Sequence, residues 1–431
     1  MSVNPEPIGV IGTGYVGLVT AAGFAELGSD VWCVDIDAAK IERLRRGEVP
    51  IYEPGLEEVL AKYGERLHFG TDLAEAMAHA RLLFVAVGTP PTYSGDADLS
   101  AVHAVVDALP PSSRHALVMK STVPCGTGAS IQRVFRERGK DGMAYVSCPE
   151  FLKEGSALKD FRNPDRVVVG DTGDWAGDAV IELYSPLADP SQVVRTDIAS
   201  AEMIKLAANA FLATKISFIN EIANVCEETG ADVIEVARGV GLDDRIGPKF
   251  LQAGIGYGGS CFTKDVSALK LLAANSGYHF QLLNAVTEVN ELQKRRVVSK
   301  LQRHIGDLAG KHVAMLGLAF KPETDDMRGA SSLVLAARLL AEGAVVSTYD
   351  PIAEQEARAL MPQLNYCSSA MDAIAGADAV VLVTEWRQFL ELDWSEVAAA
   401  MSGTVVVDGR NALDPEAIRA AELIYEGIGR R

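Results

Sequence analysis

The chain has 431 residues, 48% of them hydrophobic, and a formal net charge of −18. This length predicts two or three domains, and the acidic charge argues against a nucleic-acid partner, which would need a basic face. No apolar run approaches the roughly 20 residues of a membrane span, and the N-terminus lacks the pattern of a secretory signal, so we expect no membrane partner. The six cysteines are scattered and the seven histidines lack metal-ligand spacing. We therefore expect reduced thiols, a cytoplasmic location and no metal.

The chain opens with a strand, a glycine-rich turn and a helix. A short apolar strand is predicted at 8–11, followed by GTGYVG at 12–17 and a helix of small residues at 18–27. A second strand at 30–34 runs into Asp35. This order is typical of a Rossmann dinucleotide-binding unit.

Each part of this motif has a physical role. Gly12 permits the turn, Gly14 lets a pyrophosphate approach, and Gly17 lets helix and strand pack closely. Asp35, 18 residues after Gly17, is placed to accept from a ribose 2′-OH and would repel a 2′-phosphate. The motif therefore favours NAD over NADP; the alternative is that the glycines merely ease packing.

Further strands alternate with helices. Buried-type strands are predicted at 82–87, 116–120 and 144–147, and the strand at 166–170 is expected to be the last of this domain. Ligands of doubly wound sheets bind at the carboxyl ends of strands. Those ends carry Thr89, Ser121, Thr122 and Glu150. They outline one rim of a cleft, although turn or helix-cap duty explains each residue alone equally well.

The segment after the strand at 144–147 is rich in charge. EFLKEG at 150–155 places two carboxylates and a lysine within five residues of a strand end. Such a cluster can orient a water molecule or a hydroxyl group. A solvated loop is an equally good interpretation.

A long helix is predicted at 200–230, where apolar residues recur at helical spacing without a proline. Lys205 and Asn209 are four residues apart and so share one face. They are candidates to stabilise a substrate hydroxyl or a developing oxyanion. For Lys205 the alternative is a surface ion pair with Glu202, three residues earlier.

The sequence GIGYGGSCFTKD at 254–265 holds four glycines and one cysteine. Such glycine density predicts tight turns or close approach to a ligand. Cys261 in this loop would lie near peptide N–H groups and Lys264, which favour the thiolate. We interpret Cys261 as a covalent nucleophile; the alternative is a small buried hydrophobic residue.

A second α/β unit follows the helix-rich stretch at 266–303. Strands are predicted at 313–317, 345–349, 379–384 and 404–407, with a helix at 331–342. This half lacks GxGxxG, but Lys321 and Arg410 follow strands and can meet the phosphates of a second nucleotide-like ligand. Ordinary surface charge is the alternative.

Nine motifs in order resemble the UDP-glucose/GDP-mannose dehydrogenase family. They are GTGYVG at 12–17, VGTP at 87–90, STVP at 121–124, PEFLKEG at 149–155, NPDRVVVG at 163–170, KLAANAF at 205–211, GYGGSCFTKD at 256–265, GLAFKPETDDMR at 317–328 and DGRN at 408–411. Two positions depart from the family pattern: Cys148, where Asn is common, and Thr263, where Pro is common.

The resemblance implies an α/β fold of two Rossmann-like doubly wound domains joined by a long central helix. It implies an N-terminal NAD-binding domain at 1–198 and a central helical dimerisation domain with the cysteine loop at 199–300. A C-terminal UDP-sugar-binding domain would occupy 301–431. It also implies a homodimer.

The resemblance further implies two successive NAD-dependent oxidations at C6 of UDP-glucose. Cys261 would trap the aldehyde as a thiohemiacetal and carry the later thioester. Lys205 and Asn209 match the pair that stabilises negative charge on oxygen. Asp265, Thr122 and Glu150 match residues credited with roles around the hydrolytic water.

Binding residues are carried over on the same basis. The implied cofactor contacts are Gly12, Gly14, Tyr15, Val16, Gly17, Asp35, Lys40, Thr89, Ser121, Thr122, Glu154, Lys264 and Arg328. The implied substrate contacts are Glu150, Phe151, Leu152, Lys153, Glu154, Lys205, Asn209, Arg245, Tyr257, Gly258, Phe320, Lys321 and Arg410. In the family, the arginine matching Arg245 can reach a neighbouring subunit's site.

Three other functions remain open from the sequence. The same chemistry can act on GDP-mannose or a UDP-N-acetylhexosamine. A single-step hydroxyacid or hydroxyacyl dehydrogenase would also use a Lys-Asn pair, but it needs no cysteine in a glycine-rich loop. An idle NAD-sensing or scaffold protein would be expected to have lost Cys261, Lys205 or Asp265, and all three are present.

Overall fold

The structure is a computed structural model that describes residues 5–112 and 114–430. The chain forms two compact units. The first comprises the residues up to Ala208 together with Ser267–Gly277, and the second comprises Asn209–Val266 and the residues from Tyr278 onward. Both units are α/β, as predicted.

The first unit contains an eight-stranded sheet in the order β3-β2-β1-β4-β5-β6-β7-β8. Its first six positions follow the Rossmann order 3-2-1-4-5-6. All neighbouring strands are parallel except β6 and β7. The strands are β1 (Ile8–Ile11), β2 (Val31–Val34), β3 (Leu67–Gly70), β4 (Leu82–Val85), β5 (Ala116–Met119), β6 (Ala144–Ser147), β7 (Val167–Gly170) and β8 (Val193–Thr196).

Helices cover both faces of this sheet, because its strands are apolar on both sides. In β4, Leu82 and Phe84 face one apolar cluster while Leu83 and Val85 face another, as the alternation of side chains in a strand requires. The first cluster includes residues of α1 (Tyr15–Glu26), α2 (Ala38–Arg45), α3 (Leu56–Lys62), α7 (Ala157–Arg162) and α8 (Trp175–Tyr184). The second includes residues of α4 (Leu73–His79), α5 (Ser100–Ala108) and α6 (Thr127–Glu137).

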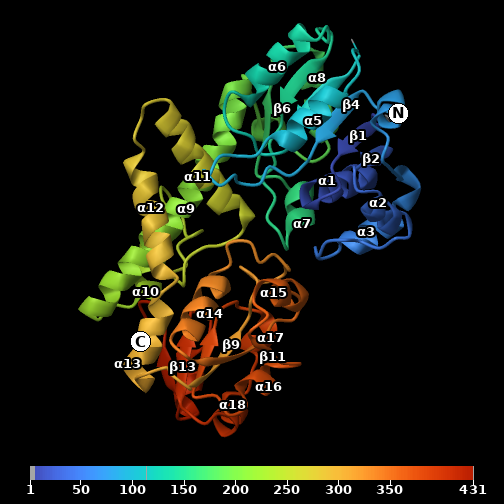
Figure 1. The fold of residues 1–431 in the computed structure, drawn as a ribbon. Helices are drawn as coiled ribbons and strands as arrows, with labels where there is room; N and C mark the ends of the chain where they lie inside the picture. Colours follow the sequence, from blue (N-terminus) through green and yellow to red (C-terminus); the bar gives the residue numbers. More distant parts are fainter. Residues whose placement is uncertain (1–4, 113, 431) are drawn as a thin grey trace. The chain divides into compact units, whose positions relative to one another are not determined.

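The second unit contains a six-stranded parallel sheet in the order β11-β10-β9-β12-β13-β14, which is again the Rossmann order. Helices α13 (Arg296–Ile305) and α14 (Ser331–Ala341) pack on one face, and α16 (Ala370–Ile374) and α18 (Trp394–Ala400) pack on the other (Figure 1). The strands are β9 (His312–Leu316), β10 (Val345–Tyr349), β11 (Asn365–Tyr366), β12 (Ala379–Leu382), β13 (Val405–Asp408) and β14 (Ile424–Glu426). The helices are α10 (Val233–Gly241), α11 (Ser260–Asn275, which continues into the first unit), α12 (Gln281–Gln293), α13 (Arg296–Ile305), α14 (Ser331–Ala341), α15 (Glu354–Leu360), α16 (Ala370–Ile374), α17 (Arg387–Leu390), α18 (Trp394–Ala400) and α19 (Pro415–Ala420).

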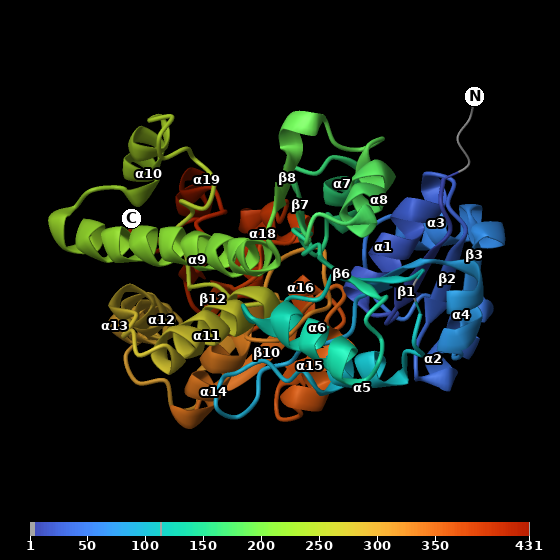
Figure 2. The ribbon, with the colours of Figure 1, turned by 90° about the horizontal axis from the view of Figure 1, so that it is seen from above.

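The long helix predicted at 200–230 is α9, which runs from Ile198 to Thr229. Figure 2 shows it as one uninterrupted helix. It carries the chain from the first compact unit into the second. No helix in the described part of the chain is both long and apolar enough to cross a bilayer.

The prediction that 166–170 is the last strand of its domain is wrong. β8 follows β7 and pairs with it in parallel at the edge of the sheet. Its sequence, VVRT, is only partly buried, so it lacks the fully apolar signature of the inner strands. For the same reason the short outer strands β3, β11 and β14 were not predicted.

Candidate functional site

The glycines of the first turn have distinct surroundings. Gly12 has φ +97°, and a Cβ there would lie 2.6 Å from the carbonyl oxygen of Ala86. A Cβ at Gly17 would lie 1.9 Å from the carbonyl oxygen of Gly12, whereas one at Gly14 would meet nothing within 4 Å. The backbone is therefore open at Gly14 and closely packed at Gly12 and Gly17.

Gly14 is also the N-cap of α1, and among the described residues this N-cap position supplies no side-chain hydrogen bond to the helix. The first N–H groups of a helix lack partners within it, and together with the helix dipole they attract anions. An open glycine before an uncapped helix suits the pyrophosphate of a dinucleotide.

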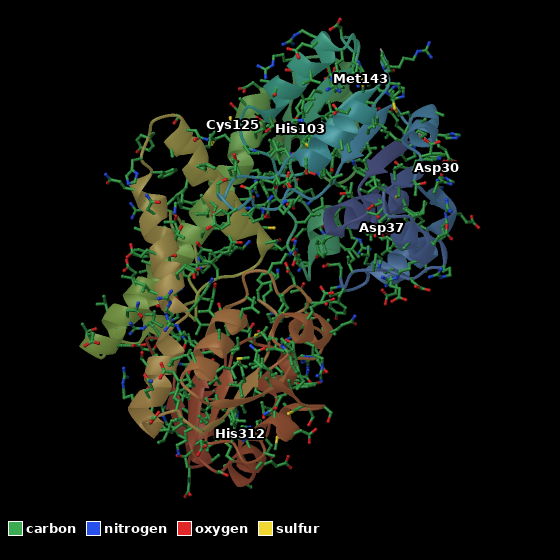
Figure 3. All side chains as sticks on the ribbon, viewed as in Figure 1. Asp30, Asp37, His103, Cys125, Met143 and His312 are labelled. Carbon is green, nitrogen blue, oxygen red and sulfur yellow. The ribbon has the colours of Figure 1, made fainter. Side chains whose placement is uncertain are left out.

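Asp35 lies directly after β2. Its Oδ2 accepts hydrogen bonds from Thr13 N and Thr13 Oγ1 at 2.8 and 2.7 Å and from Lys40 Nζ at 3.1 Å. Its Oδ1 accepts from Asp37 N at 3.0 Å; Asp37 is labelled in Figure 3. Burial acts to raise the pKa of Asp35, but the hydrogen bonds from Asp37 and Thr13 outweigh burial and hold the pKa below its ordinary value. The carboxylate is therefore an ionised acceptor at neutral pH, as recognition of a ribose hydroxyl requires.

The corresponding acid in the second unit is Asp350, which directly follows β10. Its carboxylate accepts from four backbone N–H groups and from the Trp386 indole, all at 2.7–3.1 Å. Asp350 is 2% exposed. Its carboxylate thus holds the ends of β9 and β10 together, so the acid after the second strand of this unit is buried, unlike Asp35.

Glu53 is a buried carboxylate that sequence reasoning missed. It accepts from the backbone N–H groups of Gly155 and Ala157, both at 2.7 Å, and from the Tyr15 hydroxyl. It therefore ties the first residue of α1 to the turn that contains Glu154. Burial, followed by the bond to Glu53, raises the pKa of Tyr15.

The strand ends of β4 and β5 are adjacent, as predicted. Thr89 Oγ1 donates to the carbonyl of Thr122 at 2.9 Å, and Ser121 Oγ donates to the carbonyl of Val87 at 2.7 Å. Thr89 and Ser121 thus join the two segments that follow these strands.

Lys205 and Glu150 form a buried ion pair in the first unit. Lys205 Nζ lies 3.0 Å from Glu150 Oε1 and 5.3 Å from the centre of the Phe151 ring. Burial acts to raise the pKa of Glu150, but Lys205, the Leu152 N–H and Lys120 together hold it below its ordinary value. The pair is therefore charged, and the ammonium has a fixed position.

The alternative partner for Lys205, Glu202, has a different role. Its carboxylate is buried and accepts from Gly126 N and Gly128 N, both at 2.7 Å. It caps the start of α6. The interpretation of Lys205 as the partner of a surface Glu202 is therefore wrong.

Cys261 belongs to the second unit. It is the second residue of α11, which begins at Ser260, and its Sγ lies 3.9 Å from Ser260 Oγ. The side chain is partly exposed. The prediction that Cys261 lies within a loop is wrong, because α11 already begins at Ser260. The place of Cys261 at a helix N-terminus nevertheless strengthens the reason to expect a stabilised thiolate.

The glycines before Cys261 pack against protein atoms. Only two of the four have positive φ, Gly256 at +84° and Gly259 at +82°. At every one of the four, a Cβ would lie 2.5–2.8 Å from another part of the second unit. The nearest atoms belong to Gly409, Asn290, Gly329 and Phe320 for Gly254, Gly256, Gly258 and Gly259 respectively. These positions therefore need glycine mainly because the segment packs too closely against the rest of the second unit to leave room for a Cβ.

Asp265 and Asn209 form a second buried pair. Asn209 Nδ2 donates to Asp265 Oδ2 at 2.6 Å. Asp265 Oδ1 lies 3.4 Å from Lys264 Nζ and accepts no hydrogen bond within the described residues, although Asp265 is 1% exposed. A buried carboxylate oxygen without a hydrogen bond is an acceptor site for a water molecule or another donor.

Arg410 is half-buried in the second unit. Its Nε and Nη2 donate to the carbonyls of Val383 and Phe320, both at 2.7 Å, and its Nη1 donates to Gly256 at 3.4 Å. Arg410 thus joins the end of β12 to the segment after β9 and to the glycine-rich segment. Lys321 Nζ lies 5.3 Å from the Phe320 ring, on the same segment.

The structure brings the predicted residues together in two groups. The first unit holds the glycine-rich turn with Asp35 and Lys40, the strand-end residues, and Glu150 with Lys205. The second unit holds Asn209, Cys261 and Asp265, together with Phe320 and Arg410. The exposed Arg245 and Arg328 pair with Asp243 and Asp326 respectively.

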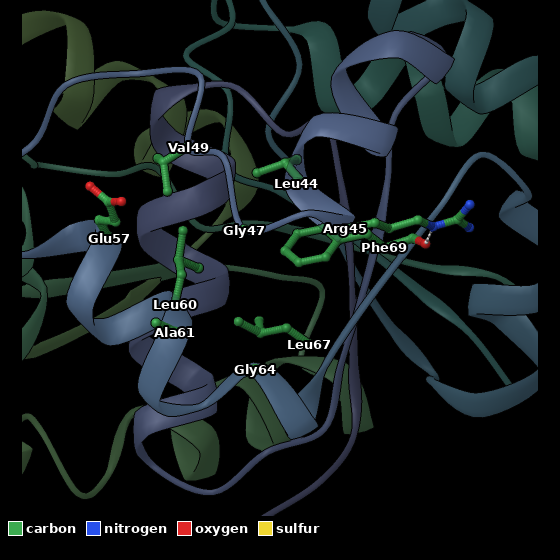
Figure 4. A pocket seen from close by; sticks show the side chains of 10 residues that line it. All are labelled: Leu44, Arg45, Gly47, Val49, Glu57, Leu60, Ala61, Gly64, Leu67 and Phe69. Atoms are coloured by element: carbon green, nitrogen blue, oxygen red, sulfur yellow. Dashed lines mark hydrogen bonds between the residues drawn. The ribbon is translucent and has the colours of Figure 1, made fainter.

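A pocket of about 340 Å³ lies at another place in the first unit (Figure 4). It is lined by residues of α2, α3 and β3 and their connections, among them Leu44, Leu60 and Phe69. None of the predicted site residues lines it.

Three comparisons with known proteins agree. Models of the UDP-glucose/GDP-mannose dehydrogenase family match the chain at 6–188 (NAD binding domain), 199–292 (central domain) and 314–415 (UDP binding domain). The chain is 46% identical over 432 residues to UDP-glucose 6-dehydrogenase TuaD of Bacillus subtilis, covering 99% of this chain and 93% of that protein. It is 48% identical over 438 residues to UDP-glucose 6-dehydrogenase of Pseudomonas aeruginosa, covering 98% and 97%. The structure of a UDP-glucose dehydrogenase from Pyrobaculum islandicum matches with a TM-score of 0.92 at 39% identity, covering 100% of this chain and 99% of that one.

Proposed function

The chain belongs to the UDP-glucose/GDP-mannose dehydrogenase family, and we propose that it is an NAD-dependent UDP-glucose 6-dehydrogenase that oxidises C6 from alcohol to acid. The observation that carries the proposal is the partly exposed Cys261 in the first turn of α11. A dehydrogenase that stops at the aldehyde needs no such nucleophile, whereas one that proceeds to the acid must retain the aldehyde.

The dinucleotide would bind at Gly14 and the N-terminus of α1, with its ribose at Asp35 and Lys40. Bound NAD supplies the hydride acceptor for each oxidation. Ile36 follows Asp35 and is 99% exposed, so it offers an apolar surface beside the ribose site that is suited to an adenine ring.

Side chains of the protein itself would stabilise the charge on the C6 oxygen and retain the aldehyde. The Lys205 ammonium, fixed by Glu150, and the Asn209 amide, fixed by Asp265, would stabilise negative charge on the C6 oxygen. The Cys261 thiolate would add to the aldehyde carbon, and protonation of the resulting oxyanion would give a thiohemiacetal. Loss of hydride from that carbon to the dinucleotide, together with loss of the hydroxyl proton, would leave a thioester.

Hydrolysis of the thioester would release the acid and return the thiol. The Oδ1 of Asp265, which accepts no hydrogen bond within the described residues, is suited to hold the attacking water. Thr122 and Glu150 match residues with roles around that water in the family. Each turnover would consume one UDP-glucose, two NAD and one water molecule, and would yield one UDP-glucuronate, two NADH and the protons released by the two oxidations.

We further propose that the chain has the three-part organisation expected from its sequence, with domains at 1–198, 199–300 and 301–431. The three matched ranges support this division. The UDP-sugar would contact residues around Tyr257 and Gly258, Phe320 and Lys321, and Arg410. A cytoplasmic location agrees with six free cysteines.

A panel of nucleotide sugars tests the substrate. We expect kcat/KM for UDP-glucose to exceed that for GDP-mannose and for UDP-N-acetylglucosamine by at least about 100-fold, because a site built to hydrogen-bond one ligand rejects others that leave its polar groups unpaired. An equal or higher kcat/KM for another nucleotide sugar would mean that the same chemistry acts on that sugar instead of UDP-glucose. No NADH from any sugar would contradict the proposal.

Asp35→Asn tests the cofactor site. We expect the Kd for NADH to rise about 10-fold, because the variant loses a charged acceptor for the ribose hydroxyl, and the Kd for NADPH to change less, because a repulsive charge is also removed. Fluorescence titration with both dinucleotides measures the ratio of the Kd for NADPH to the Kd for NADH. Asp37→Asn is the control, since Asp37 caps α2; an unchanged ratio in Asp35→Asn would contradict the assignment.

We also propose a homodimer formed through α9. Phe211, Phe218 and Val225 recur every seven residues and are 66%, 54% and 56% exposed, so they form an apolar stripe along one face of the helix. Phe218→Asp is expected to convert the dimer to a monomer in light scattering, because it places a charge in the middle of the stripe. Leu390→Asp, at an exposed apolar residue of α17, should leave the mass unchanged. A monomeric wild-type protein, or a dimeric Phe218→Asp variant, would contradict the proposal.

A further inference from the structure

Three carboxamide side chains bind the backbone just before Cys261, and a fourth binds one of the three. Asn220 and Asn224 lie on α9, and Asn290 and Gln293 lie on α12. Asn220, Asn290 and Gln293 are all at most 2% exposed. Buried amides are costly unless they make hydrogen bonds, so their partners indicate their role.

Asn290 holds both polar groups of one backbone residue. Its Oδ1 accepts from Tyr257 N at 2.8 Å, and its Nδ2 donates to the Tyr257 carbonyl at 3.1 Å. The approach is close enough that a Cβ on Gly256 would lie 2.7 Å from Asn290 Oδ1. The glycine at 256 is therefore explained by the amide that packs against it.

Gly254 is held in the same manner by two amides. Asn220 Oδ1 accepts from Gly254 N at 2.8 Å, and Gln293 Nε2 donates to the Gly254 carbonyl at 2.9 Å. The Oε1 of Gln293 accepts from Asn224 Nδ2 at 3.2 Å, which fixes the orientation of the Gln293 amide.

We propose that Asn290, supported by Gln293 and Asn220, is a positioning residue that fixes the 254–259 segment and thereby the place of Cys261 at the start of α11. The residue after the segment, Ser260, begins the helix, and Gly259 N is itself held by the Arg328 carbonyl at 2.8 Å. The backbone is thus fixed at Gly254, Tyr257 and Gly259. This inference rests on the proposed role of Cys261 as the nucleophile.

An amide is needed at 290 for a chemical reason. Only a group that donates and accepts in one plane can serve both the N–H and the carbonyl of Tyr257. A carboxylate keeps the acceptor but places an oxygen against the carbonyl, and an apolar side chain leaves both backbone groups buried and unpaired.

Asn290→Leu, which has nearly the same shape, tests the proposal in the full-length protein. We expect kcat with UDP-glucose to fall about 100-fold, as for a misplacement of about 1 Å at a reacting group. We also expect the NADH yield per limiting UDP-glucose to fall below two, because a displaced thiol lets the aldehyde leave. The KM for NAD should stay within about twofold, since the glycine-rich turn at 12–17 and Asp35 lie in the first unit and are not held by Asn290.

Ser217→Ala is the matched control. Ser217 is buried on α9 and donates to the Val286 carbonyl on α12 at 2.9 Å, so the variant loses a buried hydrogen bond between the same two helices without touching the 254–259 segment. It should keep the wild-type NADH yield. An Asn290→Leu variant with wild-type kcat and yield, or a Ser217→Ala variant with the same losses, would overturn the proposal.

Two further measurements keep the test decisive. If Asn290→Leu does not fold, Asn290→Asp retains one of the two bonds and is judged by the same criteria.

Hydrogen exchange in the wild-type protein should show the Tyr257 amide protected to a degree similar to the amides of α12. Exchange of the Tyr257 amide at the rate of an open chain would overturn the proposal that Asn290 holds this residue. A wild-type protein that yields no NADH from UDP-glucose would defeat the proposed function, and the exchange measurement would still decide whether the segment is held.

Discussion

Cys261→Ala is expected to abolish formation of the acid while the protein still binds NAD and UDP-glucose. Without the thiol there is no covalent adduct to hold the aldehyde and no thioester to hydrolyse, so acid production should fall by at least about 1,000-fold. The side chain is small and partly exposed, so its loss should barely change the stability of the fold.

Product analysis and calorimetric titration together check this result. The matched control is Cys367→Ala, which removes another partly exposed cysteine of the second unit and should retain full turnover. Unchanged acid formation by Cys261→Ala would remove the nucleophile from the mechanism and return Cys261 to a structural role.

Lys205→Met is expected to reduce both stability and turnover. Removing Lys205 leaves the buried Glu150 carboxylate without its ion-pair partner, and breaking a buried pair in this way typically lowers the free energy of unfolding by about 3–5 kcal/mol. Loss of the ammonium as an oxyanion donor should lower kcat about 100- to 1,000-fold.

The double variant Lys205→Met with Glu150→Gln separates the two effects. Replacing both charges should recover most of the free energy of unfolding, measured by denaturant titration, but none of the lost kcat. A double variant that regains turnover would contradict the role of Lys205 in catalysis, and a stable Lys205→Met single variant would contradict the charged, buried pair.

The pH dependence of stability follows from the same pair. The folded pKa of Glu150 lies below the ordinary value of 4.5, so the pair contributes fully to stability above that pH and loses its contribution as the pH falls through the folded pKa. Since the double variant has no charge at 150, it should show a smaller loss of stability below pH 4.5 than the wild-type protein.

The sequence predicted the fold because most residues of the inner strands are buried. β1, β4, β6 and β12 are buried at every residue and read as short apolar runs bounded by turn residues. The order of the strands and the intervening helices determines the Rossmann arrangement. The edge strand β8 was missed because half-buried strands at the rim of a sheet have no such run. The start of α11 was missed because its first turn directly follows a segment with four glycines, which reads as a loop.

The candidate residues could be named from motifs, but not their partners. Glu202 looks like a surface residue at helical spacing, yet it caps α6, because a segment more than 70 residues away supplies the N–H groups. Glu53 and Asn290 were missed for the same reason: a polar side chain that serves a distant backbone has no local pattern.

The number of NADH molecules formed per limiting UDP-glucose tests the central claim most directly. If Cys261 retains the aldehyde for a second oxidation, the purified protein with excess NAD should form two NADH for every sugar, with UDP-glucuronate as the product. One NADH per sugar, with free aldehyde in solution, would contradict the covalent mechanism.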